Sequence, residues 1–165
     1  MARASAALQA ALEAVCLLLL SALLIVVVTA VAARYSGLVF SWYDELASIL
    51  LAWLTYFGAA LAGLRRAHLG FDNVMRALPG QGRLIAFALA EAVTIGFFLA
   101  LGYGGWALLD LLVGETLVSM PFIPTVWVQA VIPVGAALFV AAELLSLPGA
   151  WRDYAQAPDI EGGHL

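Results

Sequence analysis

The sequence predicts an all-α integral membrane protein with four transmembrane helices. Of its 165 residues, 65% are hydrophobic and only 11% are charged, whereas soluble domains carry about 25% charged residues. The charges are also spaced so that long apolar stretches remain, and about 20 apolar residues cross a hydrocarbon core of about 30 Å. We place the spans near residues 14–33, 46–64, 84–109 and 125–147. These spans do not alternate apolar and polar residues as barrel strands do.

Charged residues and prolines delimit each span. The first lies between Glu13 and Arg34, which are separated by 20 uncharged residues. This is longer than the apolar region of a signal peptide, about 7–15 residues, so we expect the span to remain uncleaved. The second ends before Arg65, the third contains Glu91, and the fourth follows Pro124, a residue that suits a loop or a turn at the interface.

Arginine placement predicts the orientation. The segment between the second and third spans holds four arginines against one acid, Asp72, and the segment between the third and fourth spans holds two acids and no base. Because positive residues stay on the cytoplasmic side, we expect both termini in the cytoplasm of a multi-pass inner-membrane protein. Residues 1–155 would form one four-helix transmembrane domain, and residues 156–165 a short disordered cytoplasmic tail.

The arginine-rich segment contains a short helical pattern. Apolar residues at 71, 74, 75 and 78 follow the spacing i, i+3, i+4 and i+7, which is typical of one helix face. We expect a short amphipathic helix that lies on the cytoplasmic membrane surface. A docking site for another protein is the alternative.

Acidic residues within or near the spans need explanation. Glu91 could lie near the middle of the bilayer, where a charge costs about 2.5–3.5 kcal/mol on insertion scales. A structural ion pair with Arg65 or Arg66 is the first interpretation, and a proton or substrate relay is the second. Glu13 and Glu143 lie closer to the interface and are expected to reach water.

Small and aromatic residues mark candidate packing positions. Gly58 with Ala62 forms a small-xxx-small pair in the second span, and Gly63 ends a second such pair; these pairs let membrane helices approach closely. They fit packing within a four-helix bundle or against another membrane protein. Trp53 lies inside the same span and would face lipid, pack against a helix or contact a partner subunit. Pro133 interrupts the fourth span.

Several classes of function are disfavoured. The chain has seven basic residues, all arginine, and 11 acidic residues, so no basic surface is available for nucleic acid. The single Cys16 excludes a disulfide framework, and the spans contain no histidine for a b-type haem. We therefore expect no cofactor, no metal and no enzymatic activity. An autonomous four-span antiporter and a membrane anchor for a redox enzyme remain as alternatives.

Short motifs extend over almost the whole chain. In order, they are Trp42-Tyr43-Asp44-Glu45, Gly58-Ala59-Ala60, Arg65-Arg66-Ala67-His68-Leu69-Gly70-Phe71-Asp72, Leu78-Pro79, Pro124 and Ile132-Pro133-Val134-Gly135. Their order and four-span setting resemble the small membrane subunit of TRAP transporters, the tripartite ATP-independent periplasmic systems. Ser48 departs from the pattern, because members often carry a basic residue there.

This resemblance implies two protein partners and a transport role. The small subunit would join a large multi-span membrane subunit that holds the substrate and sodium sites. A periplasmic substrate-binding protein would deliver an organic acid, whose uptake is driven by an ion gradient. The small subunit would act as a scaffold for the moving large subunit.

The resemblance and the residues together suggest two contact sites. Trp42, Asp44 and Glu45 would touch the binding protein, or would be an interfacial Trp beside the acidic start of a helix. His68 beside the arginines would bind anionic membrane lipids, or the cluster would be a simple orientation signal.

Overall fold

The computed structural model describes residues 2–38, 41–65 and 80–156. Its helices are α1 (Ala2–Tyr35), α2 (Tyr43–Leu64), α4 (Gly80–Leu111), α5 (Thr125–Gln129) and α6 (Val131–Gln156). Within these ranges, four segments are long and apolar enough to cross a membrane: Ser5–Tyr35, Tyr43–Leu64, Gln81–Leu111 and Thr125–Arg152. This confirms the predicted fold class. The predicted amphipathic helix, with Arg66, His68 and Asp72, lies outside the described residues.

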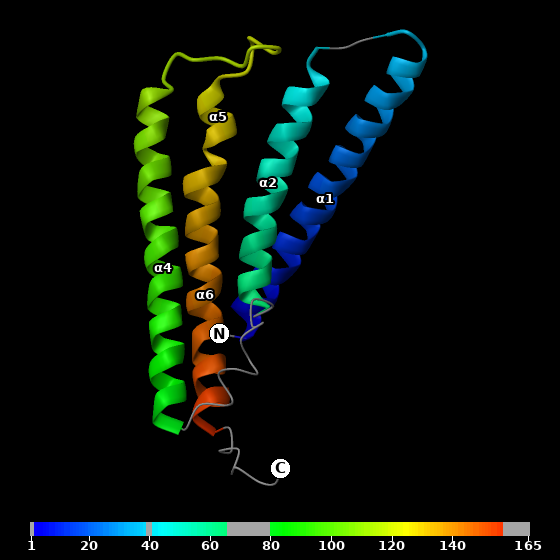
Figure 1. Cartoon of the computed structure of the whole chain (residues 1–165). Coiled ribbons are helices and arrows are strands. Elements are labelled where there is room, and N and C mark those ends of the chain that lie inside the picture. Colours follow the sequence, from blue (N-terminus) through cyan, green and yellow to red (C-terminus); the bar gives the residue numbers. More distant parts are fainter. Residues whose placement is uncertain (1, 39–40, 66–79, 157–165) are drawn as a thin grey trace, which may run out of the picture.

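The long helices stand side by side in a row (Figure 1), in the order α4, α6, α2 and α1. Helix α6 is the most enclosed: 33% of its most apolar stretch is buried, against 6% to 11% in the other three. The four long helices of the described residues therefore form an open layer. Lipid tails are as apolar as leucine side chains, so no hydrophobic force drives such a layer to close.

The helices extend beyond the predicted spans. Helix α1 has 34 residues and is about 51 Å long at about 1.5 Å per residue. Helix α6 continues through Pro148, one residue past the predicted end of the fourth span. The helices therefore continue beyond the charged residues that delimit the predicted spans.

Local chemistry explains where α1 ends and α2 begins. Gly37 has a φ of 79°, and the N–H groups of Gly37 and Leu38 donate to the carbonyls of Arg34 and Ala33. These two bonds form a Schellman motif, which favours glycine at the left-handed position. Helix α2 then carries two acids in its first turn, where the helix dipole favours negative charge.

The core lies where α6 meets its neighbours. Phe139 of α6 is 2% exposed, and its ring stacks on Phe98 of α4 with 3.6 Å between ring centroids. On the other side it packs with Ala60 of α2 and Leu12 of α1. This cluster connects all four long helices.

Candidate functional site

Glycines allow α6 to approach both neighbouring helices. A Cβ atom added at Gly135 of α6 would lie 2.6 Å from the Cβ of Tyr56 on α2. One added at Gly105 of α4 would lie 2.6 Å from Ile132 of α6. Any larger side chain would force these helices apart, so both positions require glycine.

The small residues predicted in α2 have different roles. Gly63 is buried, and an added Cβ would lie 3.1 Å from Glu143 Oε2 and 3.2 Å from the ring of Phe139. Ala62 is half-buried. Gly58 has open space around its Cβ position. Within the chain, only Gly63 of these three makes the close glycine contact that the sequence predicts.

Trp53 of α2 contacts the fourth span at the point where its helix is interrupted. Its indole N–H donates to the carbonyl of Val128 at 3.1 Å. Pro133 has no N–H for the carbonyl of Gln129, and the helix is interrupted at Ala130 between α5 and α6. Such interruptions leave carbonyls that other groups must satisfy. Trp53 therefore ties α2 to this interruption.

Glu45 of α2 binds the loop that connects α4 and α5. Its carboxylate accepts hydrogen bonds from the backbone N–H groups of Val118 at 3.1 Å and Ser119 at 2.8 Å. Of the other two residues in the predicted outer contact, Asp44 is exposed and Trp42 is 38% exposed. Glu45 thus already binds its own chain, which leaves Asp44 and Trp42 as the accessible members of the group.

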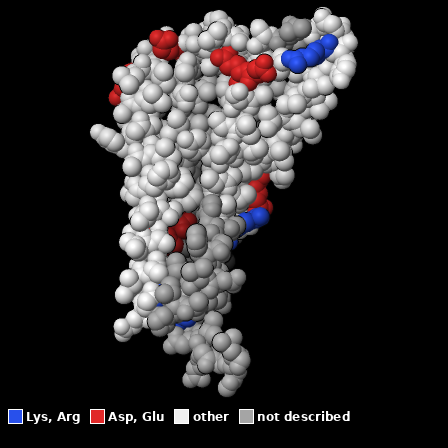
Figure 2. Space-filling model, viewed as in Figure 1, with Lys and Arg blue, Asp and Glu red and all other residues white. Residues whose placement is uncertain are grey.

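Charged side chains gather at one end of the row and also occur inside it. Figure 2 shows acids along the end at which α2 begins and α4 ends, with a broad uncharged surface below them. This acidic end carries Asp44, Glu45, Asp110 and Glu115. We call the other end the opposite end.

At the opposite end, Arg65 of α2 forms an ion pair with Glu13 of α1 at 2.5 Å. Arg65 is therefore not the partner of Glu91, because α4 and α2 are separated by α6 in the row, and the other predicted candidate, Arg66, lies outside the described residues. Glu91 is 9% exposed and Arg83 is 3% exposed. Glu143 is 7% exposed, so the expectation that it reaches water is also wrong.

A stripe of small residues lies on α4, and sequence reasoning singles out only its glycines, Gly96 and Gly104. Ala88, Ala92, Gly96, Ala100 and Gly104 recur at every fourth position, and all five are exposed. An added Cβ at Gly96 or Gly104 meets nothing within 4 Å. The four-residue period was the available signal. We call these five residues the α4 stripe.

These features define a multi-pass membrane protein whose polar groups mostly hold its own helices together. A protein-family model described as "Tripartite ATP-independent periplasmic transporters, DctQ component" matches residues 23–153. The chain belongs to this family, the small permease subunits of TRAP transporters, which are transporter components and not enzymes.

One curated relative is also similar to part of the chain. It is the uncharacterized protein y4mM of Sinorhizobium fredii, 34% identical over 96 residues. The match covers 57% of this chain and 17% of the relative, so the chain matches less than a fifth of that relative's length.

Proposed function

We propose that this small permease subunit is a fixed scaffold for the large membrane subunit of its transporter. The transport cycle would be binding-protein-dependent uptake of an organic acid, driven by a sodium gradient across the bacterial inner membrane. The family's general partnership with a large membrane subunit and a periplasmic binding protein supports this assignment.

The α4 stripe is the observation that carries the proposal. In a membrane, helices associate through close packing of small residues. The glycines that the chain uses for its own packing face neighbouring helices, whereas the stripe faces outward from α4, which stands at one edge of the row. We assign the stripe to a transmembrane helix of the large subunit.

Rigidity supports the scaffold role. Transporters move one membrane unit against another around a fixed reference. Here the central helix α6 is held to α2 by Gly135 against Tyr56, and to α4 by the stacked rings of Phe98 and Phe139. A layer fixed in this way would move as one body.

The experiment compares three substitutions with identical chemistry. Ala92→Leu and Ala100→Leu place a large side chain on the stripe, while Ala90→Leu places one on an exposed position of α4 outside it. The tagged chain is co-expressed with the large subunit and purified. We expect Ala92→Leu and Ala100→Leu to reduce recovery of the large subunit about tenfold, the equivalent of about 1.4 kcal/mol.

Ala90→Leu should leave recovery unchanged. Equal recovery for all three variants would refute the assignment of the stripe. If the complex forms, proton- or sodium-driven uptake in proteoliposomes with the binding protein then tests the transport reaction and its coupling ion.

The accessible outer residues supply the second part of the proposal. Trp42 lies at the acidic end and outside the groove that Asp44 lines, and we place the contact with the periplasmic binding protein there. Trp42→Ala should weaken binding-protein-dependent uptake without loss of the membrane complex. Unchanged uptake would exclude this contact.

A further inference from the structure

An open groove lies between helices α1 and α2 near the acidic end. Its volume is about 300 Å³, at the lower limit of typical ligand sites, about 300–1,000 Å³. The apolar walls are Val27, Ala30 and Val31 of α1 and Ala47 of α2. Figure 1 shows the cause: α1 lies close to α2 at the opposite end and diverges from it towards the acidic end.

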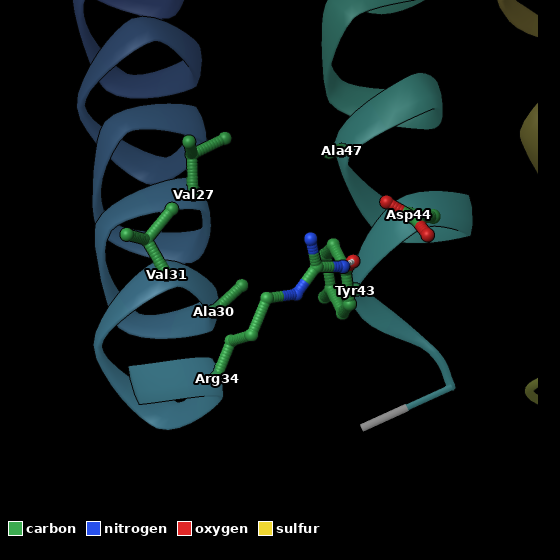
Figure 3. A pocket seen from close by; sticks show the side chains of 7 residues that line it. All are labelled: Val27, Ala30, Val31, Arg34, Tyr43, Asp44 and Ala47. Carbon is green, nitrogen blue, oxygen red and sulfur yellow. Dashed lines mark hydrogen bonds between the residues drawn. The ribbon is translucent and has the colours of Figure 1, made fainter. Parts of the chain in front are cut away.

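The mouth of the groove carries one charge of each sign. The guanidinium of Arg34 projects from α1 into the space between the helices, beside the ring of Tyr43 (Figure 3). It donates one hydrogen bond to the Tyr43 hydroxyl, and its Cζ lies 5.8 Å from the ring centroid. The carboxylate of Asp44 belongs to the same lining, and Arg34 and Asp44 do not form an ion pair with each other.

Arg34 is positioned to bind an anion. A guanidinium has five N–H donors, and the contact with Tyr43 uses one of them. The hydrogen bond to the Tyr43 hydroxyl also orients the Arg34 side chain, so less conformational freedom remains to be lost on binding. Phosphate is a preferred partner of arginine because two parallel hydrogen bonds fit its oxygens.

We propose that the groove binds one phospholipid with a primary ammonium headgroup, of the phosphatidylethanolamine class. One acyl chain lies along the apolar walls, the phosphate binds Arg34, and the ammonium binds Asp44. The paired charges of the mouth match a zwitterionic headgroup, whereas an anionic headgroup would meet the Asp44 carboxylate. The bilayer is as apolar as the groove, so selectivity resides in the headgroup.

The test measures lipids retained by the full chain. It is purified from nanodiscs that contain equal amounts of phosphatidylethanolamine, phosphatidylcholine and phosphatidylglycerol with identical acyl chains, and native mass spectrometry counts the adducts. We expect about a tenfold preference for phosphatidylethanolamine, the effect of one charge-assisted hydrogen bond. Arg34→Gln and Ala30→Phe should each reduce the retention of all three lipids about tenfold or more, the first because it removes the partner of the phosphate that they share and the second because it fills the groove.

Two matched variants serve as controls. Ala32→Phe adds the same ring on an exposed part of α1 outside the groove, and Arg152→Gln removes an exposed arginine of α6. Both should keep the wild-type preference. The Asp44→Asn variant should retain phosphatidylglycerol and phosphatidylethanolamine in equal amounts. Circular dichroism checks that each variant remains helical.

Two results would overturn the proposal. One is a wild-type chain with no headgroup preference, or with lipid retention that Arg34→Gln and Ala30→Phe leave intact. The other comes from a photo-crosslinking amino acid at Val31 in native membranes. A protein adduct there, in place of a lipid adduct, would show that another subunit occupies the groove.

Discussion

Replacement of Gly135 by alanine tests how the row of helices is held together. The added Cβ would lie 2.6 Å from the Cβ of Tyr56 and 2.8 Å from its Cδ1. Carbon atoms pack best at about 3.5–4.0 Å, so α2 and α6 would have to separate by about 1 Å. The Cβ of Tyr56 is fixed to the backbone, so a change of rotamer cannot relieve this contact.

The expected cost of Gly135→Ala is about 1–3 kcal/mol, the usual penalty for overpacking a core. Alanine favours helix over glycine by about 1 kcal/mol. In a membrane the separated helices remain helical, so this gain does not offset the clash. Gly58→Ala is the matched control, because open space surrounds its Cβ position, and we expect its stability to change by less than about 0.5 kcal/mol.

The assay is unfolding of the purified chain in mixed micelles with increasing SDS, followed by tryptophan fluorescence and circular dichroism. Gly135→Ala should unfold at a lower SDS fraction than Gly58→Ala, with similar slopes. If both variants unfold at the same SDS fraction, the close contact between α2 and α6 does not determine stability, and the reasoning fails.

Two further substitutions test the polar ties between helices. Glu45→Gln leaves a single uncharged acceptor for the N–H groups of Val118 and Ser119, and their hydrogen–deuterium exchange should accelerate about tenfold; unchanged exchange would show that the carboxylate does not hold this loop. Trp53→Phe removes the indole donor to α5 and should cost about 0.5–1.5 kcal/mol in the SDS assay. Trp106→Phe, at a site 66% exposed, is its control and should be neutral.

The sequence predicts the four spans because hydrocarbon excludes charge. The stretch between Glu13 and Arg34 shows this well, since α1 covers it completely. The same reasoning places helix ends poorly. The interface accepts both charged side chains and helical backbone, so α1 and α6 continue past the charged residues that mark the spans.

The order of helices in the row could not be predicted. Span sequences state which residues are apolar or small, but several neighbours fit the same pattern. The pairing of Arg65 with Glu91 failed for this reason, because both residues are expected near the same membrane side yet α6 separates their helices. Likewise, the sequence predicts that Glu45 is an exposed residue at the start of a helix. Its hydrogen bonds with Val118 and Ser119 become evident only in the folded chain, which brings their loop next to it.

The distribution of glycines connects the open layer to its role as a subunit. Gly63, Gly105 and Gly135 are buried at contacts between α6 and its neighbours, and these account for packing within the chain. In a closed bundle, the five residues of the α4 stripe would face another helix. In the row they face outward, and the membrane offers no reason to keep five small residues at a four-residue period towards lipid. Such a surface is favourable when another helix packs against it. The partner helix that we propose would explain both the open layer and the α4 stripe.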